Sequence, residues 1–183
     1  MTPWIAKPVP FNIGQGAAGA GGAAAVEWTT NGQRDTMTID GVNAYSSGTV
    51  SGGWKYRLNT NSGHASYEFE LSRLSGSGND IFCGLTDDPD IAGTPSPETF
   101  IDQAVYLTVN DAKWRLYSGG TKIIEWTDGA VDDTIKFEFT SATLITVYSN
   151  GVSKGTMSVS AGYQTNVNLC FVPNSPNLNC ELL

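Results

Sequence analysis

Short segments in which apolar and polar residues alternate are the feature that most restricts how this chain can fold. The segment 67–71 is the clearest case, because its odd-numbered residues are apolar while Glu68 and Glu70 are charged. Alternate residues of an extended chain face opposite sides, so this pattern predicts a strand with one buried face. No segment after residue 25 repeats its apolar residues at the 3.6-residue helical period. We predict strands at 25–29, 36–39, 54–58, 67–71, 81–85, 105–109, 113–117, 122–126, 135–139, 144–148, 153–157, 167–171 and 178–182.

Turn-forming residues separate these segments. Asn150-Gly151 is a two-residue hairpin signal, and Ser118-Gly119-Gly120 serves in the same way. Many short strands joined by hairpins form an antiparallel sandwich or a barrel, and the number of strands favours a sandwich. With 183 residues, of which 40% are hydrophobic and 21 are glycine, the chain supplies both the turns and the core of one such domain.

Residues 1–25 differ in composition from the rest of the chain. Three prolines precede a run of Gly and Ala with almost no side chains that can bury surface. We predict that 1–25 form an arm or tether and that 26–183 form the β-sandwich domain. The arm is either a disordered terminus or a segment that becomes ordered on a partner. In the second case Trp4, Ile5 and Phe11 are its apolar anchors.

Charge and cysteine content restrict the partners and the place of folding. The net charge is −8 with only ten Lys and Arg, which argues against a nucleic-acid partner. No segment is apolar for 18 residues, and the N-terminus does not have the pattern of a signal peptide. Cys83 and Cys170 lie in apolar strand contexts, so we predict that they are small core residues. These features favour folding in a reducing cytoplasm.

The order of these segments resembles a known family. Residues 64–85 run from the Tyr67-Glu68-Phe69-Glu70-Leu71 strand through a small-residue turn into Gly84-Leu85, and they resemble the paired strands of SPRY-type domains. Residues 132–151 extend the resemblance, with two strands that end in the Asn-Gly hairpin. The resemblance covers about 64–172 and implies a concanavalin A-like jelly roll. Members of that class are mostly binding modules for glycans or protein surfaces, and a minority are glycanases.

Catalytic residues are not evident in this sequence. A glycanase needs at least two carboxylates across the sugar ring. Glu68 and Glu70 meet this requirement, because they are predicted to share one face of a strand with a separation of about 7 Å. Glycanases of this fold carry a third acid two or three residues after the second one. In this chain Ser72 and Arg73 occupy those positions, so the third acid is missing. The single histidine, His64, lies in a turn and is predicted to be a surface or turn residue, and there is no Gly-x-Ser-x-Gly elbow. We therefore assign no catalytic residue.

An acidic loop runs from residue 87 to Asp102. Asp87, Asp88 and Asp90 open this loop, and carboxylate oxygens are ligands that calcium prefers. The spacing lacks the regularity of an EF-hand loop. The loop is therefore either a calcium site or an ordinary solvated acidic loop, and no other cofactor is indicated.

Aromatic residues next to polar ones are candidates for glycan or partner binding. A sugar ring has an apolar face that stacks on Trp or Tyr, while its hydroxyl groups need polar partners nearby. Most aromatic residues of a sandwich nevertheless belong to its core. The preferred candidates are Trp54 and Tyr56 on one strand face, and Trp114 close to Asn110 and Asp111; Tyr117 and Trp126 are further candidates.

The predicted function is a non-enzymatic, lectin-like structural or binding module. The acidic composition and the arm favour a surface-exposed component of a phage or virus particle, such as a decoration, fibre or tail protein. Its arm would attach to another virion or scaffold protein, and its sandwich would bind a glycan or a host surface, in a homo-oligomer made in the host cytoplasm. The alternatives are an intracellular SPRY-type protein-interaction module and a glycan hydrolase that uses Glu68 and Glu70.

Overall fold

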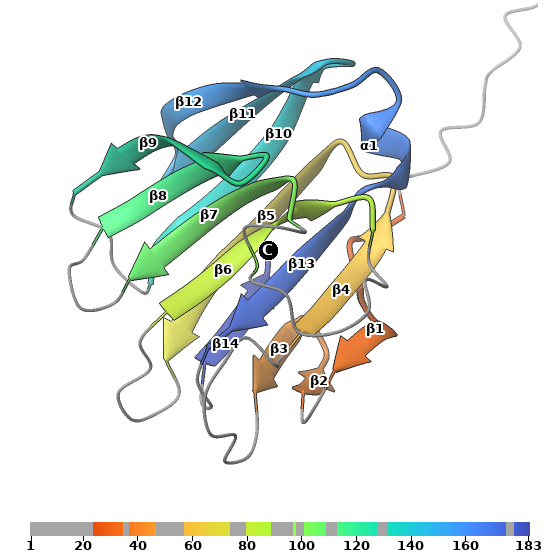
Figure 1. Ribbon diagram of the computed structural model, residues 1–183. Coiled ribbons are helices and arrows are strands. Elements are labelled where there is room, and N and C mark those ends of the chain that lie inside the picture. Colours follow the sequence, from red (N-terminus) through yellow and green to blue (C-terminus); the bar gives the residue numbers. More distant parts are fainter. Residues whose placement is uncertain are drawn as a thin grey trace, which may run out of the picture.

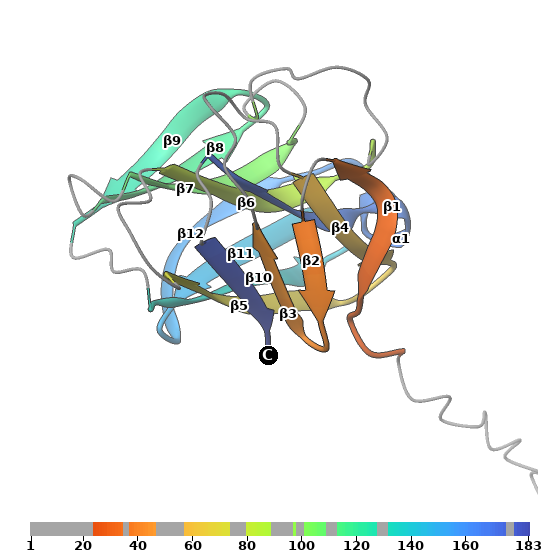
Figure 2. The same cartoon turned by 90° about the horizontal axis from the view of Figure 1, so that it is seen from below.

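Alternating residues place apolar side chains between two antiparallel sheets in the computed structural model of the chain (Figure 1). Figure 2 shows the same two layers from below, with one sheet above the other. The described residues are 24–34, 37–46, 57–73, 80–88, 97, 101–108, 113–127, 132–174 and 178–183. Within them the chain is a β-sandwich, as the sequence predicts.

Among the described residues each sheet has seven strands, and all pairs of neighbours are antiparallel. Sheet A consists, in order across the sheet, of β1 (Trp28–Arg34), β4 (Arg57–Ser62), β13 (Asn168–Pro173), β6 (Asp80–Thr86), β7 (Gln103–Thr108), β8 (Lys113–Ser118) and β9 (Thr121–Trp126). Sheet B consists of β12 (Val152–Ser158), β11 (Leu144–Ser149), β10 (Thr134–Ser141), β5 (Ser66–Arg73), β14 (Leu178–Leu182), β3 (Asn43–Ser46) and β2 (Met37–Asp40). A short helix, α1 (Tyr163–Asn166), precedes β13.

The main core lies between the two sheets. Tyr67, Phe69 and Leu71 of β5 are fully buried there, while Glu68 and Glu70 are half-buried on the outer face of sheet B. This outcome confirms the strand predicted from their alternation. A second, smaller apolar cluster covers the outer face of sheet A, and it contains Phe82, Ile101, Ala104, Cys170 and Val172.

The hairpin predictions are confirmed by the backbone. Asn150 and Gly151 have φ angles of 49° and 73°, and they connect β11 to β12. Gly119 and Gly120 have φ angles of 52° and 75° between β8 and β9. Positive φ at both central residues is the geometry of a type I′ turn, which Asn-Gly and Gly-Gly accept at little cost.

Two elements were not predicted from the sequence. One is β3, which pairs with β2 through a two-residue turn at Gly41 and Val42. Gly41 has a φ of 60° at the first central position, and a glycine there is itself a hairpin signal. The other is α1, whose four residues are too short to show a helical period. The first predicted strand, 25–29, instead begins at Trp28, and only 57–58 of the predicted strand 54–58 are described.

The cysteines are core residues, as predicted for Cys83 and Cys170. Both are fully buried free thiols, and Cys180 is a third. Burial is the main reason why the pKa of the Cys83 thiol is raised, and the neighbouring Cys180 thiol adds to it. The arm anchors Trp4, Ile5 and Phe11 lie outside the described residues. No helix in the described part of the chain is long and apolar enough to cross a membrane.

Candidate functional site

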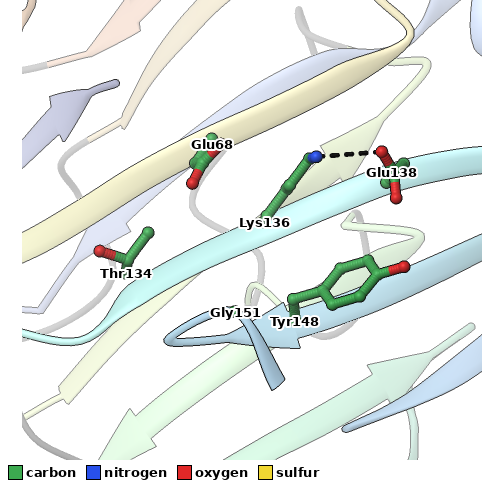
Figure 3. Close-up of a pocket in the computed structure, with 6 residues that line it drawn as sticks. All are labelled: Glu68, Thr134, Lys136, Glu138, Tyr148 and Gly151. Atoms are coloured by element: carbon green, nitrogen blue, oxygen red, sulfur yellow. Dashed lines mark hydrogen bonds and ion pairs between the residues drawn. The ribbon is translucent and has the colours of Figure 1, made fainter. Parts of the chain in front are cut away.

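A shallow hollow lies on the outer face of sheet B, over β5, β10 and β11. Figure 3 shows the residues that line it, which belong to these three strands and to the turn after β11. The hollow has a volume of about 280 Å³. It is lined by Glu68, Thr134, Lys136, Glu138, Tyr148 and Gly151.

The strand register explains why these residues meet. In β10, Ile135 and Phe137 are fully buried, so Thr134, Lys136 and Glu138 face outward. Lys136 is directly opposite Glu68 of β5 on one side and Tyr148 of β11 on the other. Side chains directly opposite in neighbouring strands lie close together. Lys136 is therefore the centre of the hollow.

Two charged side chains of β10 form an ion pair at this centre. Lys136 Nζ donates to Glu138 Oε1 at 3.0 Å, with exposed side-chain fractions of 29% and 35%. This contact is the main cause of the raised pKa of Lys136 and of the lowered pKa of Glu138. A hydrogen bond from the Tyr148 hydroxyl lowers the pKa of Glu138 further. Lys136 Nζ also lies 5.9 Å from the centre of the Tyr148 ring. Both groups of the pair are thus held in their charged forms.

The arrangement favours binding over acid–base catalysis. A glycoside hydrolase needs one carboxylic acid whose pKa is raised, so that it can donate a proton to the leaving group. The pKa of Glu138 is instead lowered by Lys136. Glu68 and Glu70 do share the outer face of β5, as predicted, but only Glu68 lines the hollow. An aromatic ring among charged and hydroxyl groups suits a ligand that is polar at its edges and apolar on one face.

A polar network that runs from the core to the surface holds the turn beside the hollow. Trp114 Nε1 donates to Asp133 Oδ2 at 2.8 Å, and Asn150 Nδ2 donates to Asp133 Oδ1 at 2.7 Å. The backbone N–H of Thr134 donates to Asn150 Oδ1 at 2.9 Å. Asp133 therefore connects the core to the Asn150-Gly151 turn, and Gly151 lines the hollow.

Trp114 is a core residue and not a binding residue. Its side chain has 0% exposure, so it offers no free face to a ligand, in contrast to the prediction. The prediction relied on the polar neighbours of Trp114 in β8. Residues next to each other in a strand face opposite sides of the sheet, so polar neighbours indicate a buried side chain here. Of the other preferred candidates, Trp54, Tyr56, Asn110 and Asp111 lie outside the described residues, and their role stays a prediction.

The two further aromatic candidates lie on or near sheet A. Tyr117 is half-buried on its outer face, with its ring centre 5.8 Å from that of Phe82 and 6.2 Å from that of Tyr106. Trp126 is also half-buried and stacks on Trp114 at 6.3 Å. Neither of them lines the hollow on sheet B.

Sequence reasoning did not select Tyr148 or Lys136, although a signal for both was present. In 144–148 the apolar residues Ile145 and Val147 are buried, which places Tyr148 on the polar side of its strand. An aromatic residue on the polar side of an alternating strand faces away from the core, so its ring is available to a ligand. Lys136 and Glu138 alternate with buried residues in the same way.

His64 lies in the turn before β5, as predicted, but it is not a surface residue. Its side chain is only 7% exposed, and its Nε2 donates to Asn61 Oδ1 at 2.9 Å. Its ring meets the Tyr67 ring edge-on at 5.4 Å. These contacts give His64 a packing role.

The acidic loop is described only at its two ends and at Pro97. Asp87 and Asp88 are exposed, and the backbone N–H of Asp87 donates to Asp102 Oδ2 at 3.2 Å. Asp90 lies outside the described residues, so the predicted calcium site at Asp87, Asp88 and Asp90 stays a prediction. Within the described ranges, no group of three or more His, Cys, Asp and Glu side chains is placed to hold a metal ion.

Comparison with known proteins identifies the fold. No family model matches the sequence, and no curated protein is similar to it in sequence. A human SPRY domain matches with a TM-score of 0.57 at 16% identity, over 81% of this chain and 94% of that chain. The NHR domain of Neuralized from Drosophila melanogaster matches at 0.54 and 13% identity, over 89% and 94% of the two chains.

Stonustoxin also matches, with a TM-score of 0.58 at 12% identity over 87% of this chain. This chain spans only 28% of the length of that one. At such identities the similarity shows the fold alone. The protein has a concanavalin A-like jelly-roll fold like that of SPRY and NHR domains, as the resemblance in its sequence implies.

Proposed function

We propose that this protein is a non-enzymatic binding module that binds a glycan in the hollow on sheet B. The observation that carries this proposal is the position of the Tyr148 ring, which lies next to the Lys136–Glu138 ion pair and opposite Glu68 across β10. A sugar ring placed there stacks its C–H face on Tyr148. Its hydroxyl groups donate to the Glu68 carboxylate and accept from Lys136.

The shape of the hollow sets the expected strength of binding. It is open and shallow, at about 280 Å³, so it buries only part of one or two sugar units. A single site of this kind binds weakly, and several copies on one particle or oligomer raise the overall affinity through effective concentration. The predicted homo-oligomer would supply those copies.

The ion pair is the reason to favour binding over hydrolysis. Lys136 stabilises the charged form of Glu138, so Glu138 is a poor proton donor near neutral pH. A lectin site benefits from the same feature, because fixed charges hold hydroxyl groups without a change of protonation. Glu138 is therefore unsuited to act as the proton donor of a glycan hydrolase in this hollow.

A glycan array with the full chain tests the proposal. We expect Tyr148→Ala to weaken binding about 3- to 10-fold, since an aromatic contact contributes roughly 0.5–1.5 kcal/mol. Lys136→Met should also weaken binding, because it removes the ammonium donor. The matched control is Tyr45→Ala, which removes another half-buried tyrosine from the outer face of sheet B, outside the hollow.

Three outcomes contradict the proposal. The first is a glycan ligand whose affinity is unchanged by Tyr148→Ala. The second is turnover of a polysaccharide that disappears in Glu68→Gln, which would establish the hydrolase alternative. The third is a specific protein ligand bound independently of Tyr148 in a chain that binds no glycan, which would establish the SPRY-type alternative.

We further propose that the module is displayed on a phage or virus particle through its N-terminal arm. Support comes from the composition of residues 1–25 and from the acidic, lysine-poor character of the chain. The fold and the comparisons do not bear on this location. Deleting residues 1–25 should prevent incorporation into particles while the sandwich still folds, and unchanged incorporation would remove the arm from the mechanism.

A further inference from the structure

The turn between β11 and β12 is an Asn-Gly pair, Asn150-Gly151, and such a pair can modify itself. The backbone nitrogen of the glycine attacks the side-chain amide carbon of the asparagine, because glycine has no side chain that hinders the approach. The new C–N bond closes a succinimide ring, while the Cγ–Nδ2 bond breaks and ammonia leaves with the proton of the glycine N–H. Water then opens the ring at either carbonyl and leaves aspartate or isoaspartate.

The backbone of this turn explains why the reactive pair stands here. Asn150 is exposed, and its φ of 49° is the only positive φ of a non-glycine residue in the described part of the chain. Gly151 follows with a φ of 73°. A two-residue turn with positive φ at both central positions favours Asn-Gly over almost any other pair. The turn therefore requires the residues that make the chain susceptible to deamidation at this point.

Hydrogen bonds hold the side-chain amide of Asn150 at both ends. Its Nδ2 donates to Asp133 Oδ1 at 2.7 Å, and its Oδ1 accepts from the backbone N–H of Thr134 at 2.9 Å. Asp133 is only 6% exposed, and its other carboxylate oxygen accepts from Trp114 at 2.8 Å. The partner of Nδ2 is thus fixed to the core, and the amide of Asn150 is fixed to that partner.

The strand order places these partners away from the attacking nitrogen. β10 lies on one side of β11 and β12 lies on the other. Thr134 opens β10, whereas Gly151 leads into β12. The amide carbon of Asn150 must therefore leave the side of β10 to reach the Gly151 nitrogen, and this movement breaks both side-chain hydrogen bonds. The bond to Asp133 is the stronger of the two, because its acceptor is a carboxylate.

We propose that Asn150 is a deamidation site that its contact with Asp133 keeps closed in the folded chain. The reaction is irreversible for this turn. Aspartate at position 150 has no amide proton for Asp133, and the two carboxylates repel each other at this distance. Isoaspartate in addition lengthens the main chain of a two-residue turn that sets the register of β11 and β12.

The turn also borders the hollow on sheet B. Gly151, Thr134 and Tyr148 all line that hollow (Figure 3). A change in the turn should therefore weaken glycan binding there, and this consequence rests on the proposed function. The deamidation site itself does not depend on what the hollow binds.

A time course of the full chain in mildly alkaline buffer tests the proposal, with peptide mapping that separates asparagine, aspartate and isoaspartate at position 150. Asp133→Asn is the informative variant. Its amide oxygen can still accept from Trp114, but its NH₂ group then faces the NH₂ group of Asn150. We expect Asn150 to react about 2- to 5-fold faster in this variant, since one hydrogen bond no longer opposes the reaction.

The matched control is Asp132→Asn, which makes the same change of charge at the exposed neighbouring residue and should leave the rate unchanged. Asn31-Gly32 is an internal reference in the same peptide map, because a general loosening of the chain would accelerate both pairs. Wild-type chain unfolded in urea supplies the reference rate if Asp133→Asn does not fold, and Asn150 should react faster there than in the folded chain.

Two results would overturn the proposal. One is an Asn150 that reacts as fast in the folded chain as in urea. The other is a folded Asp133→Asn variant in which Asn150 reacts at the wild-type rate. Asn150→Asp tests the link to the hollow separately: a glycan ligand bound equally well by this variant would contradict the effect on binding, whereas a chain without any glycan ligand contradicts the proposed function alone.

Discussion

Asp133 should be among the least replaceable polar residues of this protein, because it satisfies a buried donor from the core. Trp114 has no exposed surface, and its Nε1 donates to Asp133 Oδ2 at 2.8 Å. The other carboxylate oxygen accepts from Asn150 Nδ2 at 2.7 Å. Asp133→Ala removes both acceptors and leaves the indole N–H of Trp114 buried without a partner.

The expected loss of stability follows from these two hydrogen bonds. A buried donor left unsatisfied costs about 1–3 kcal/mol. Asn150 is exposed, so water can replace its partner, and the second bond adds only about 0.5–1 kcal/mol. We therefore expect Asp133→Ala to lower the free energy of unfolding by about 2–4 kcal/mol. Asp133→Asn should cost less, because its amide oxygen can still accept from Trp114.

Urea denaturation followed by tryptophan fluorescence measures this loss. Asp132→Ala is the matched control, since Asp132 is the exposed neighbour of Asp133 and its removal should change stability by less than about 0.5 kcal/mol. Combining Asp133→Ala with Trp114→Phe in a double-mutant cycle isolates the indole contact. We expect a coupling energy of about 1 kcal/mol or more for two residues in direct contact.

Two results would contradict this role of Asp133. If Asp133→Ala is as stable as Asp132→Ala, the buried indole N–H does not need this acceptor. If the two substitutions of the cycle are additive, the loss of stability comes from elsewhere around Asp133 and not from Trp114.

Three further predictions concern other parts of the sandwich. Gly84→Ala should lower the free energy of unfolding, measured by urea denaturation, by more than about 3 kcal/mol. The reason is that a Cβ at this position would lie 2.2 Å from the backbone carbonyl oxygen of Gln103. Glu181→Lys should raise the free energy of unfolding by about 0.5 kcal/mol in the same assay, since Glu181 is directly opposite Glu70 and the two like charges repel. An unchanged urea midpoint would show that water screens this pair. The folded chain binds the Asp102 proton more tightly than the unfolded chain, because burial raises the pKa of this carboxyl. The melting temperature should therefore fall as pH rises from the ordinary aspartate pKa through the raised one, and Asp102→Asn should remove that fall.

Most strands, several turns and the faces of the most regular strands could be predicted from the sequence alone. Alternation is a local property, since neighbouring residues of an extended chain face opposite sides whatever the strand later pairs with. This is why Tyr67, Phe69 and Leu71 are buried where alternation places them. The same rule, applied strictly, would have buried Trp114 and exposed Tyr148.

The tertiary structure alone decided which strands are neighbours and what meets on their faces. β5 pairs with β10 and β14, which come from distant parts of the chain, and this pairing brings Glu68 beside Lys136. Gln103 is an ordinary polar residue in the sequence, and only the packing of the core leaves its Oε1 buried without a hydrogen-bond partner among the described residues. Strand pairing depends on the packing energy of the whole core, which cannot be read from the sequence of any single segment.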